Sequence, residues 1–238
     1  MSKPLAGRVA LVTGASRGIG AATAEQLAAA GAHLLLTGRT EGGLEEVEAR
    51  IHAAGGTATI APMDLLDAEA ITRLANAVSS RWGKLDILVL NAGVLGDLMP
   101  VTHVEPKDFD RILAVNLGTA HRLLRAFDPL LRASEHGRVV ALTSSVAVKP
   151  RAYWGPYAAS KAAIEMLVSC YAEEVKNISA TRVAIVNPGA TRTAMRAKAF
   201  PGEDAATLKG PEVVAAAIVG LLTEDFETGA RVDLKTAN

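Results

Sequence analysis

Tyr157 and Lys161 are the residues whose types and spacing are best suited to proton transfer. They lie four positions apart in PYAASKAA, so on a helix their side chains project from one face, and Pro156 suits the first turn of that helix. A free phenol has a pKa of about 10, and a nearby ammonium favours its ionised form. Tyr157 could therefore give a proton to a carbonyl oxygen or take one from an alcohol.

A glycine-rich turn, TGASRGIG at residues 13–20, follows an apolar run and leads into an alanine-rich stretch. Glycines at positions 14, 18 and 20 permit a tight turn and a close approach of the backbone to a pyrophosphate, which the start of the following helix would face. The pattern predicts a dinucleotide site, and a tight strand-to-helix turn without a ligand is the alternative.

The elements that must position these residues alternate along the chain. Apolar runs predict strands at residues 8–12, 33–37, 57–62, 86–90, 138–143, 182–186 and 230–234. Helical patterns lie between them, at residues 18–30, 41–54, 68–81, 107–132, 153–177 and 211–222. Most of the short runs are uniformly apolar, which is typical of parallel strands covered on both faces. We therefore expect one α/β domain over residues 1–238, a doubly wound parallel sheet of about seven strands with helices on both faces.

The GxxxGxG spacing of TGASRGIG, with the YxxxK pattern, resembles the short-chain dehydrogenase/reductase family over nearly the whole chain. This resemblance implies a Rossmann fold and an enzyme that transfers hydride between a nicotinamide cofactor and a carbonyl or alcohol carbon. The pairing of AYWGPYAASK with NPGATRTAMRAKAFPGED resembles in particular the YciK-type bacterial oxidoreductases. The physiological substrate and the favoured direction do not follow from it, because the fold and proton relay serve many reactions.

The resemblance also implies a catalytic group made of Asn116, Ser144, Tyr157 and Lys161. Ser144 lies at the end of the fifth apolar run, thirteen residues before Tyr157, and its hydroxyl would bond the substrate oxygen. Ser145 is adjacent, but the strand register favours Ser144. Asn116 would hold a water that leads from Lys161 to solvent, and a buried asparagine with only a structural hydrogen bond is the alternative.

Cofactor-binding residues follow from the same resemblance at the ends of several predicted strands. Asp64 would bond the adenine ring, with a helix N-cap as its alternative. The turn at Asn91 would support the cofactor, and the Pro188-Gly189 segment would bind the nicotinamide carboxamide unless it is a simple turn. The full predicted set is Gly14, Ser16, Arg17, Gly18, Ile19, Gly20, Arg39, Asp64, Leu65, Asn91, Ala92, Gly93, Tyr157, Lys161, Pro188, Gly189, Thr191 and Thr193.

Arg39, directly after the second apolar run, bears on the choice of cofactor. An NAD site needs an acidic side chain there to accept the ribose 2′-hydroxyl, whereas Arg39 and Arg17 could clamp a 2′-phosphate. Taken singly, each arginine would be interpreted as a solvated surface charge. Together they predict that NADP(H) is preferred over NAD(H).

Composition argues against other partners. Lys plus Arg and Asp plus Glu both number 25, so no net field gathers nucleic acid or an anionic membrane. No apolar run has the roughly 18 residues of a membrane span, and the start, MSKPLAGRVALV, lacks a secretory cleavage site, so we expect a cytoplasmic protein. The five histidines and one cysteine form no metal-ligand pattern, and Cys170 is expected to be buried.

Residues 192–210, RTAMRAKAFPGEDAATLKG, occupy the position of the family's variable substrate lid. The expected partner is a small-molecule carbonyl or alcohol. Tyr153, Trp154, Leu95 and Met195 are candidates for its apolar walls, with ordinary packing as the equal alternative for each. The helices at 107–132 and 153–177 correspond to those that pair family members into homodimers or homotetramers.

Three other functions stay open at this point. A 3-oxoacyl-thioester (acyl-carrier-protein) reductase is the alternative among enzymes, although no basic cluster marks an acyl-carrier surface. A catalytically silent nucleotide-binding regulatory protein is the alternative of a different class, and the intact Ser144, Tyr157 and Lys161 argue against it. An S-adenosylmethionine methyltransferase would need an acidic side chain where Arg39 stands.

Overall fold

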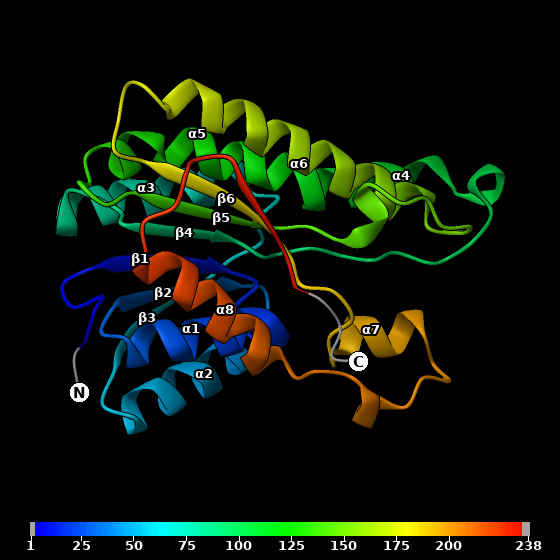
Figure 1. Cartoon of the computed structure of the whole chain (residues 1–238), viewed down its shortest axis with the longest axis horizontal. Helices are drawn as coiled ribbons and strands as arrows, with labels where there is room; N and C mark the ends of the chain where they lie inside the picture. The colour runs from blue at the N-terminus through cyan, green and yellow to red at the C-terminus, as the bar shows by residue number, and fades with distance from the viewer. Residues whose placement is uncertain (1–2, 235–238) are drawn as a thin grey trace.

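Seven parallel strands form a sheet in the order β3-β2-β1-β4-β5-β6-β7 in the computed structural model, which describes residues 3–234 (Figure 1). The strands are β1 (Val9–Thr13), β2 (His33–Gly38), β3 (Thr57–Pro62), β4 (Ile87–Leu90), β5 (Arg138–Leu142), β6 (Arg182–Asn187) and β7 (Ala230–Asp233). Residues 1–2 and 235–238 of the expected domain lie outside the described residues. The predicted fold class, an α/β protein with a doubly wound parallel sheet, is confirmed.

Helices cover both faces of this sheet. They are α1 (Gly18–Ala29), α2 (Glu41–Ala53), α3 (Ala68–Trp82), α4 (Pro106–Leu113), α5 (Thr119–Arg132), α6 (Gly155–Val175), α7 (Ala194–Ala199) and α8 (Pro211–Thr223). Leu11 and Leu35 pack into a core with α3, α5 and α6, whereas Leu34 and Leu36 pack into a second core with α1, α2 and α8 (Figure 1). Because successive residues of one strand enter different cores, the strands are apolar throughout.

The strand order reverses between β1 and β4. β1 pairs with β2 on one side and with β4 on the other, so that Val12 lies opposite both Leu36 and Val89. Connections that leave two neighbouring strands in opposite directions open a crevice at the carboxyl ends of those strands. The glycine-rich turn after β1 and Asn91 after β4 therefore meet at this crevice.

The helix expected over residues 107–132 is interrupted. α4 ends at Leu113, a π-helical segment covers Ala114–Gly118, and α5 begins at Thr119. A π turn widens a helix by one residue and is frequent at functional sites. The widened turn holds Asn116, which is buried with its amide bonded to the backbone of Val94. Helical propensity along this stretch did not indicate the interruption.

The expectation that Cys170 is buried is wrong, because the residue is exposed. α6 buries Ile164, Val168 and Ala172, which recur at helical spacing on one face. Cys170 lies one turn after Met166, which is 67% exposed on the opposite face. The apolar run around the cysteine did not reveal which of its residues face the core.

The expected lid, residues 192–210, contains α7 and a 3-10 turn at Ala205–Thr207. Its two ends meet, because Arg192 N donates to Lys209 O at 2.9 Å. Lys198 on α7 pairs with Asp97 after β4, with 2.8 Å between Nζ and Oδ1. Figure 1 shows α7 apart from the two helical layers. Within residues 3–234, no helix is both long and apolar enough to cross a membrane.

Candidate active site

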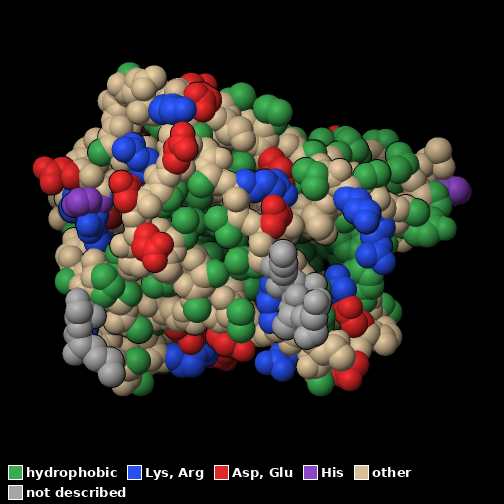
Figure 2. Space-filling view, in the orientation of Figure 1, with side chains coloured by type: hydrophobic (Ala, Val, Ile, Leu, Met, Phe, Trp, Pro, Cys, Tyr) green, Lys and Arg blue, Asp and Glu red, His purple; other side chains and the backbone are tan. Residues whose placement is uncertain are grey.

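A cavity of about 1180 Å³ lies where the carboxyl ends of the strands meet the lid. Figure 2 shows apolar side chains in a hollow on this face, with Lys and Arg side chains beside it. Ser144, Tyr157 and Lys161 lie on the cavity wall with all but one of the predicted cofactor residues. Two predicted residues, Gly20 and Asn116, do not line the cavity. Gly20 lies against Gly14 and Asn116 is bonded to Val94, and both of these neighbours line the cavity.

Hydrogen bonds from the end of β4 hold the glycine-rich turn. Asn91 Nδ2 donates to the carbonyl oxygens of Thr13 at 2.8 Å and Gly14 at 3.2 Å. Thr13 Oγ1 accepts from the backbone N–H groups of Asn91 and Ala92, at 3.0 and 3.1 Å. Gly14 has a φ of +65°, a left-handed conformation that glycine adopts without strain. Asn91 therefore fixes the shape of the turn as well as lining the cavity.

The first turn of α1 suits an anion. Arg17, its N-cap residue, forms no side-chain cap, and the turn contains no acidic residue, so backbone N–H groups are left for a ligand. Gly18 and Ile19 line the cavity at this point. The partial positive charge at the start of a helix favours a phosphate. These features fit the pyrophosphate of a dinucleotide.

Arg17 and Arg39 lie on the cavity wall with exposed side chains, and Arg39 directly follows β2 as predicted. Within residues 3–234, neither guanidinium forms an ion pair or a hydrogen bond. Both groups are therefore placed where a ligand phosphate could be bound. Their exposure is also what a solvated surface charge would show, so the geometry leaves the cofactor preference a prediction.

Asp64 also lines the cavity, but it does not cap a helix. Its Oδ1 accepts from Leu66 N at 2.9 Å in a local turn. Asp67 is the N-cap of α3 and accepts from the backbone N–H groups of Glu69 and Ala70. The N-cap alternative for Asp64 is therefore wrong.

Tyr157 lies in the first turn of α6 and is 7% exposed. Burial raises the pKa of the Tyr157 phenol to about 12, and a hydrogen bond with Ser144 opposes that rise. The direction is opposite to the one expected from the neighbouring ammonium, because the loss of hydration on burial disfavours the phenolate. Tyr157 is therefore protonated at neutral pH in this structure.

Lys161 lies one turn further along α6 and is 4% exposed. Its Nζ donates to Leu142 O at 2.8 Å and lies 5.8 Å from the centroid of the Tyr157 ring. Burial lowers the pKa of Lys161 to about 8, and the charge of Glu165 acts in the opposite direction. The charge beside the phenol therefore depends on pH near the physiological range.

Asn116 is fixed behind the cavity wall by three hydrogen bonds. Its Oδ1 accepts from Val94 N at 2.8 Å, and its Nδ2 donates to Val94 O and Ser160 Oγ, both at 2.9 Å. A Cβ added at Gly93 would lie 3.3 Å from Asn116 Oδ1 and 3.7 Å from Lys161 Nζ, so Gly93 lies between the two side chains. These hydrogen bonds are the ones expected of a buried asparagine with a structural role. The role of Asn116 in holding a water stays a prediction.

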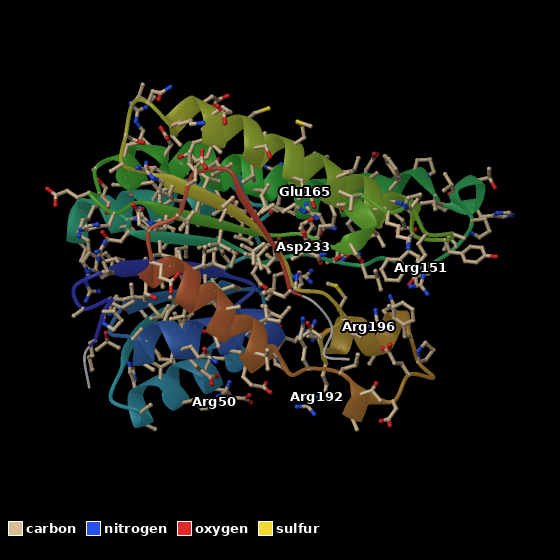
Figure 3. The ribbon with its side chains drawn as sticks, in the orientation of Figure 1. Arg50, Arg151, Glu165, Arg192, Arg196 and Asp233 are labelled. Carbon is tan, nitrogen blue, oxygen red and sulfur yellow. The ribbon has the colours of Figure 1, made fainter. Side chains whose placement is uncertain are left out.

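A network of charged side chains beside α6 was not predicted. Glu165 accepts from Thr143 Oγ1 and from Arg231 Nη1, each at 2.5 Å. Arg231 Nε donates to Asp233 at 3.1 Å, and Asp233 accepts from Asn187 Nδ2 at 2.8 Å. Figure 3 shows Glu165 on α6 above Asp233 on the last strand. The network joins α6 to the ends of β5, β6 and β7, and no spacing in the sequence indicated it.

The predicted nicotinamide segment follows β6 and bends toward the glycine-rich turn. Thr191 Oγ1 donates to the carbonyl oxygens of Pro188 and Gly189, both at 3.3 Å. A Cβ added at Gly18 would lie 3.6 Å from Thr193 Cγ2. Thr191 therefore stabilises its own turn, whereas Thr193 lies beside the glycine-rich turn.

Three of the four candidate wall residues, Leu95, Trp154 and Met195, line the cavity. Tyr153 does not. It is 58% exposed and has a left-handed backbone with a φ of +73°. Phe200 of the lid lines the cavity instead, with its ring centroid 5.7 Å from that of Trp154. Sequence reasoning missed Phe200 because nothing in the lid sequence indicated which of its side chains face the cavity.

The chain is similar to a known protein family and to a bacterial protein of nearly the same length. A family model described as short chain dehydrogenase matches residues 8–204. A protein of Escherichia coli (strain K12) described as "Uncharacterized oxidoreductase YciK" is 39% identical over 231 residues, which cover 95% of this chain and 91% of that protein.

Solved structures are similar over almost the whole chain. A short chain dehydrogenase from Pseudomonas syringae has a TM-score of 0.94 and 39% identity, with 98% of this chain and 96% of that chain covered. A short chain dehydrogenase from Shigella flexneri 2A strain 301, complexed with NADP, has a TM-score of 0.93 and 37% identity, with 98% and 99% covered.

Proposed function

This chain belongs to the short-chain dehydrogenase family and is an oxidoreductase, and from that premise we propose that it transfers hydride between NADP(H) and a small-molecule carbonyl or alcohol. The observation that carries the proposal is the convergence of Ser144, Tyr157 and Lys161 on one cavity with the glycine-rich turn. A bound nicotinamide supplies or takes up the hydride. The residues of the chain hold the reactants and move the proton.

Tyr157 gives its proton to the substrate oxygen when a carbonyl is reduced. With a pKa of about 12, the phenol is protonated at neutral pH, and the oxygen that it faces becomes strongly basic during the reaction. Ser144, which is hydrogen-bonded to Tyr157, stabilises the charge on that oxygen. The ammonium form of Lys161 lowers the cost of the phenolate that remains.

Arg17 and Arg39 support a preference for NADP(H) over NAD(H). Both guanidinium groups lie on the cavity wall, and an arginine stands where an NAD site would place a carboxylate. A 2′-phosphate would accept charge-assisted hydrogen bonds from both. The NADP bound to the Shigella flexneri relative is in agreement with this preference.

Tyr157→Phe tests the proton transfer because it removes only the hydroxyl. We expect NADPH oxidation with a panel of ketones, aldehydes and quinones to fall by about 10²–10⁴-fold, while NADPH affinity changes little in a fluorescence titration. Tyr171→Phe is the matched control, because Tyr171 is on the same helix but donates to Asp128 at 2.9 Å, away from the cavity.

Wild-type turnover in Tyr157→Phe would contradict the assigned acid. A wild-type protein that binds NADPH but turns over no member of the panel would favour the nucleotide-binding regulatory alternative.

A further inference from the structure

Beyond the predicted cofactor positions, the cavity continues along an apolar wall. Trp154 is 9% exposed and stands edge-on to Tyr157, with ring centroids 5.8 Å apart. Phe200 of the lid packs on Trp154 with a centroid distance of 5.7 Å. Leu95 and Val146 complete the buried part of this cluster. A substrate whose carbonyl meets the phenol would therefore lie along aromatic and aliphatic side chains.

Arg151 lies at the far end of this wall. Its guanidinium carbon is 4.5 Å from the centroid of Phe200 and 5.7 Å from that of Trp154. Contacts with two rings restrict a flexible side chain but leave its N–H donors available. Within the described part of the chain, the guanidinium forms no hydrogen bond or ion pair, and Arg151 lines the cavity. Although Arg151 is exposed, its guanidinium is positioned by these two ring contacts.

The charges at this end of the cavity do not cancel. Arg196 stacks on the same phenyl ring at 3.7 Å and donates to both carboxylate oxygens of Glu203, each at 2.6 Å. The hydrogen bond from Arg196 lowers the pKa of Glu203 most, and the charge of Arg151 adds to this effect. The Glu203 carboxylate is therefore bonded to Arg196, and no second carboxylate pairs with Arg151 within the described residues. Asp97 does not supply the missing charge, because it pairs with Lys198.

The position of Arg151 sets the size of a matching ligand. Figure 3 shows that Arg151 and Arg196 lie close to one another but come from different segments. Arg151 is in the connection that precedes α6, and Arg196 is in α7. The Trp154 ring centroid lies 5.7 Å from the Arg151 guanidinium carbon and 5.8 Å from the Tyr157 ring centroid. The guanidinium and the Tyr157 ring are therefore no further apart than these two distances combined. A small molecule can therefore reach both groups at once.

We propose that the substrate is an apolar ketone or aldehyde that carries an anionic group, a carboxylate or a phosphate, at the end remote from its carbonyl, and that Arg151 binds this group. The inference rests on the proposed function of the same cavity. The planar guanidinium matches both anions with two parallel hydrogen bonds. The apolar wall accommodates the body of the molecule between the anion and the carbonyl.

Three para-substituted acetophenones that differ in charge test the inference: 4-acetylbenzoate, 4-acetylphenyl phosphate and the uncharged 4-acetylbenzamide. Each is titrated by calorimetry into the full chain saturated with NADP⁺. We expect at least one anion to bind about fivefold more tightly than the amide. Arg151→Ala should remove that difference, so that the ratio of anion affinity to amide affinity falls to about one, and the better anion identifies the group.

Arg81→Ala is the matched control, because the Arg81 guanidinium carbon lies 4.5 Å from the Trp82 ring centroid, outside the cavity. This variant should keep the preference for the anion. Equal binding of all three compounds to the wild type, no binding of either anion, or a preference that survives Arg151→Ala overturns the inference. Turnover of the neutral amide by the wild type tests the proposed function separately, since the amide carries no anionic group.

Discussion

Gly20→Ala examines whether the glycine-rich turn is held in the way the structure shows. An added Cβ at Gly20 would lie 2.3 Å from Gly14 O and 2.5 Å from Asn91 Nδ2, inside the 3.0 Å below which real Cβ atoms essentially never lie. The backbone of the turn or the Asn91 amide must therefore move. Because the same amide donates to Thr13 O and Gly14 O, its movement breaks these bonds as well.

Forcing an additional methyl into a packed site costs about 1–3 kcal/mol. In a chain of this length, a cost of about 2 kcal/mol lowers Tm by about 4–8 °C. Gly14 lines the cavity, so a displaced turn also weakens cofactor binding. If the loss in binding is about 1.4 kcal/mol or more, the Kd for NADPH rises at least tenfold.

Thermal melts without ligand and fluorescence titrations with NADPH measure the two effects. Gly220→Ala is the control, because Gly220 lies in α8 and its added Cβ would meet nothing within 4 Å. Alanine there should stabilise the protein by about 0.5–1 kcal/mol and leave the affinity for NADPH unchanged. A Gly20→Ala protein with the Tm and Kd of the wild type would refute the described geometry of the turn.

Three other predictions concern the cofactor, the proton relay and the fold. Arg39→Asp should raise the Kd for NADPH roughly tenfold and leave that for NADH nearly unchanged, and equal losses would reject the phosphate contact. Carbonyl reduction should decline as the pH rises through about 8, where Lys161 loses its proton. Glu165→Gln removes the charge that raises this pKa, so the decline should move to lower pH, and an unchanged pH profile would contradict this coupling. Asp86 is fully buried and accepts three hydrogen bonds, two of them from the buried Val9 N–H and Ser134 hydroxyl, so Asp86→Ala should reduce the free energy of unfolding by about 1–3 kcal/mol in urea, and a loss under about 0.5 kcal/mol would be inconsistent with this network.

Local patterns were the informative part of the sequence. The members of TGASRGIG and of the YxxxK pattern are neighbours in the chain, and strand-to-helix geometry alone brings most of them to the cavity wall. The strands were predictable because a parallel sheet covered on both faces requires uniformly apolar runs. The family resemblance, including that to the YciK-type oxidoreductases, is confirmed.

Contacts between distant segments were beyond prediction. Glu165 meets Arg231 across 66 residues, and no spacing rule links them. Arg151 contacts Phe200 of the lid across 49 positions, and no local pattern links the two residues. Cys170 was wrongly expected to be buried because the rotation of α6 about its axis depends on packing. The cytoplasmic location, the homo-oligomer and the choice of substrate stay predictions.

Isotope transfer follows the hydride itself. The wild-type protein is supplied with 4-acetylbenzamide, or the best ketone of the panel, and with NADPH that is deuterated stereospecifically at C4 of the nicotinamide. We predict that one of the two labelled forms yields an alcohol with a single deuterium on its carbinol carbon, detected by mass spectrometry. An alcohol product that carries no deuterium from either form would show that hydride does not pass from the nicotinamide to the carbonyl carbon.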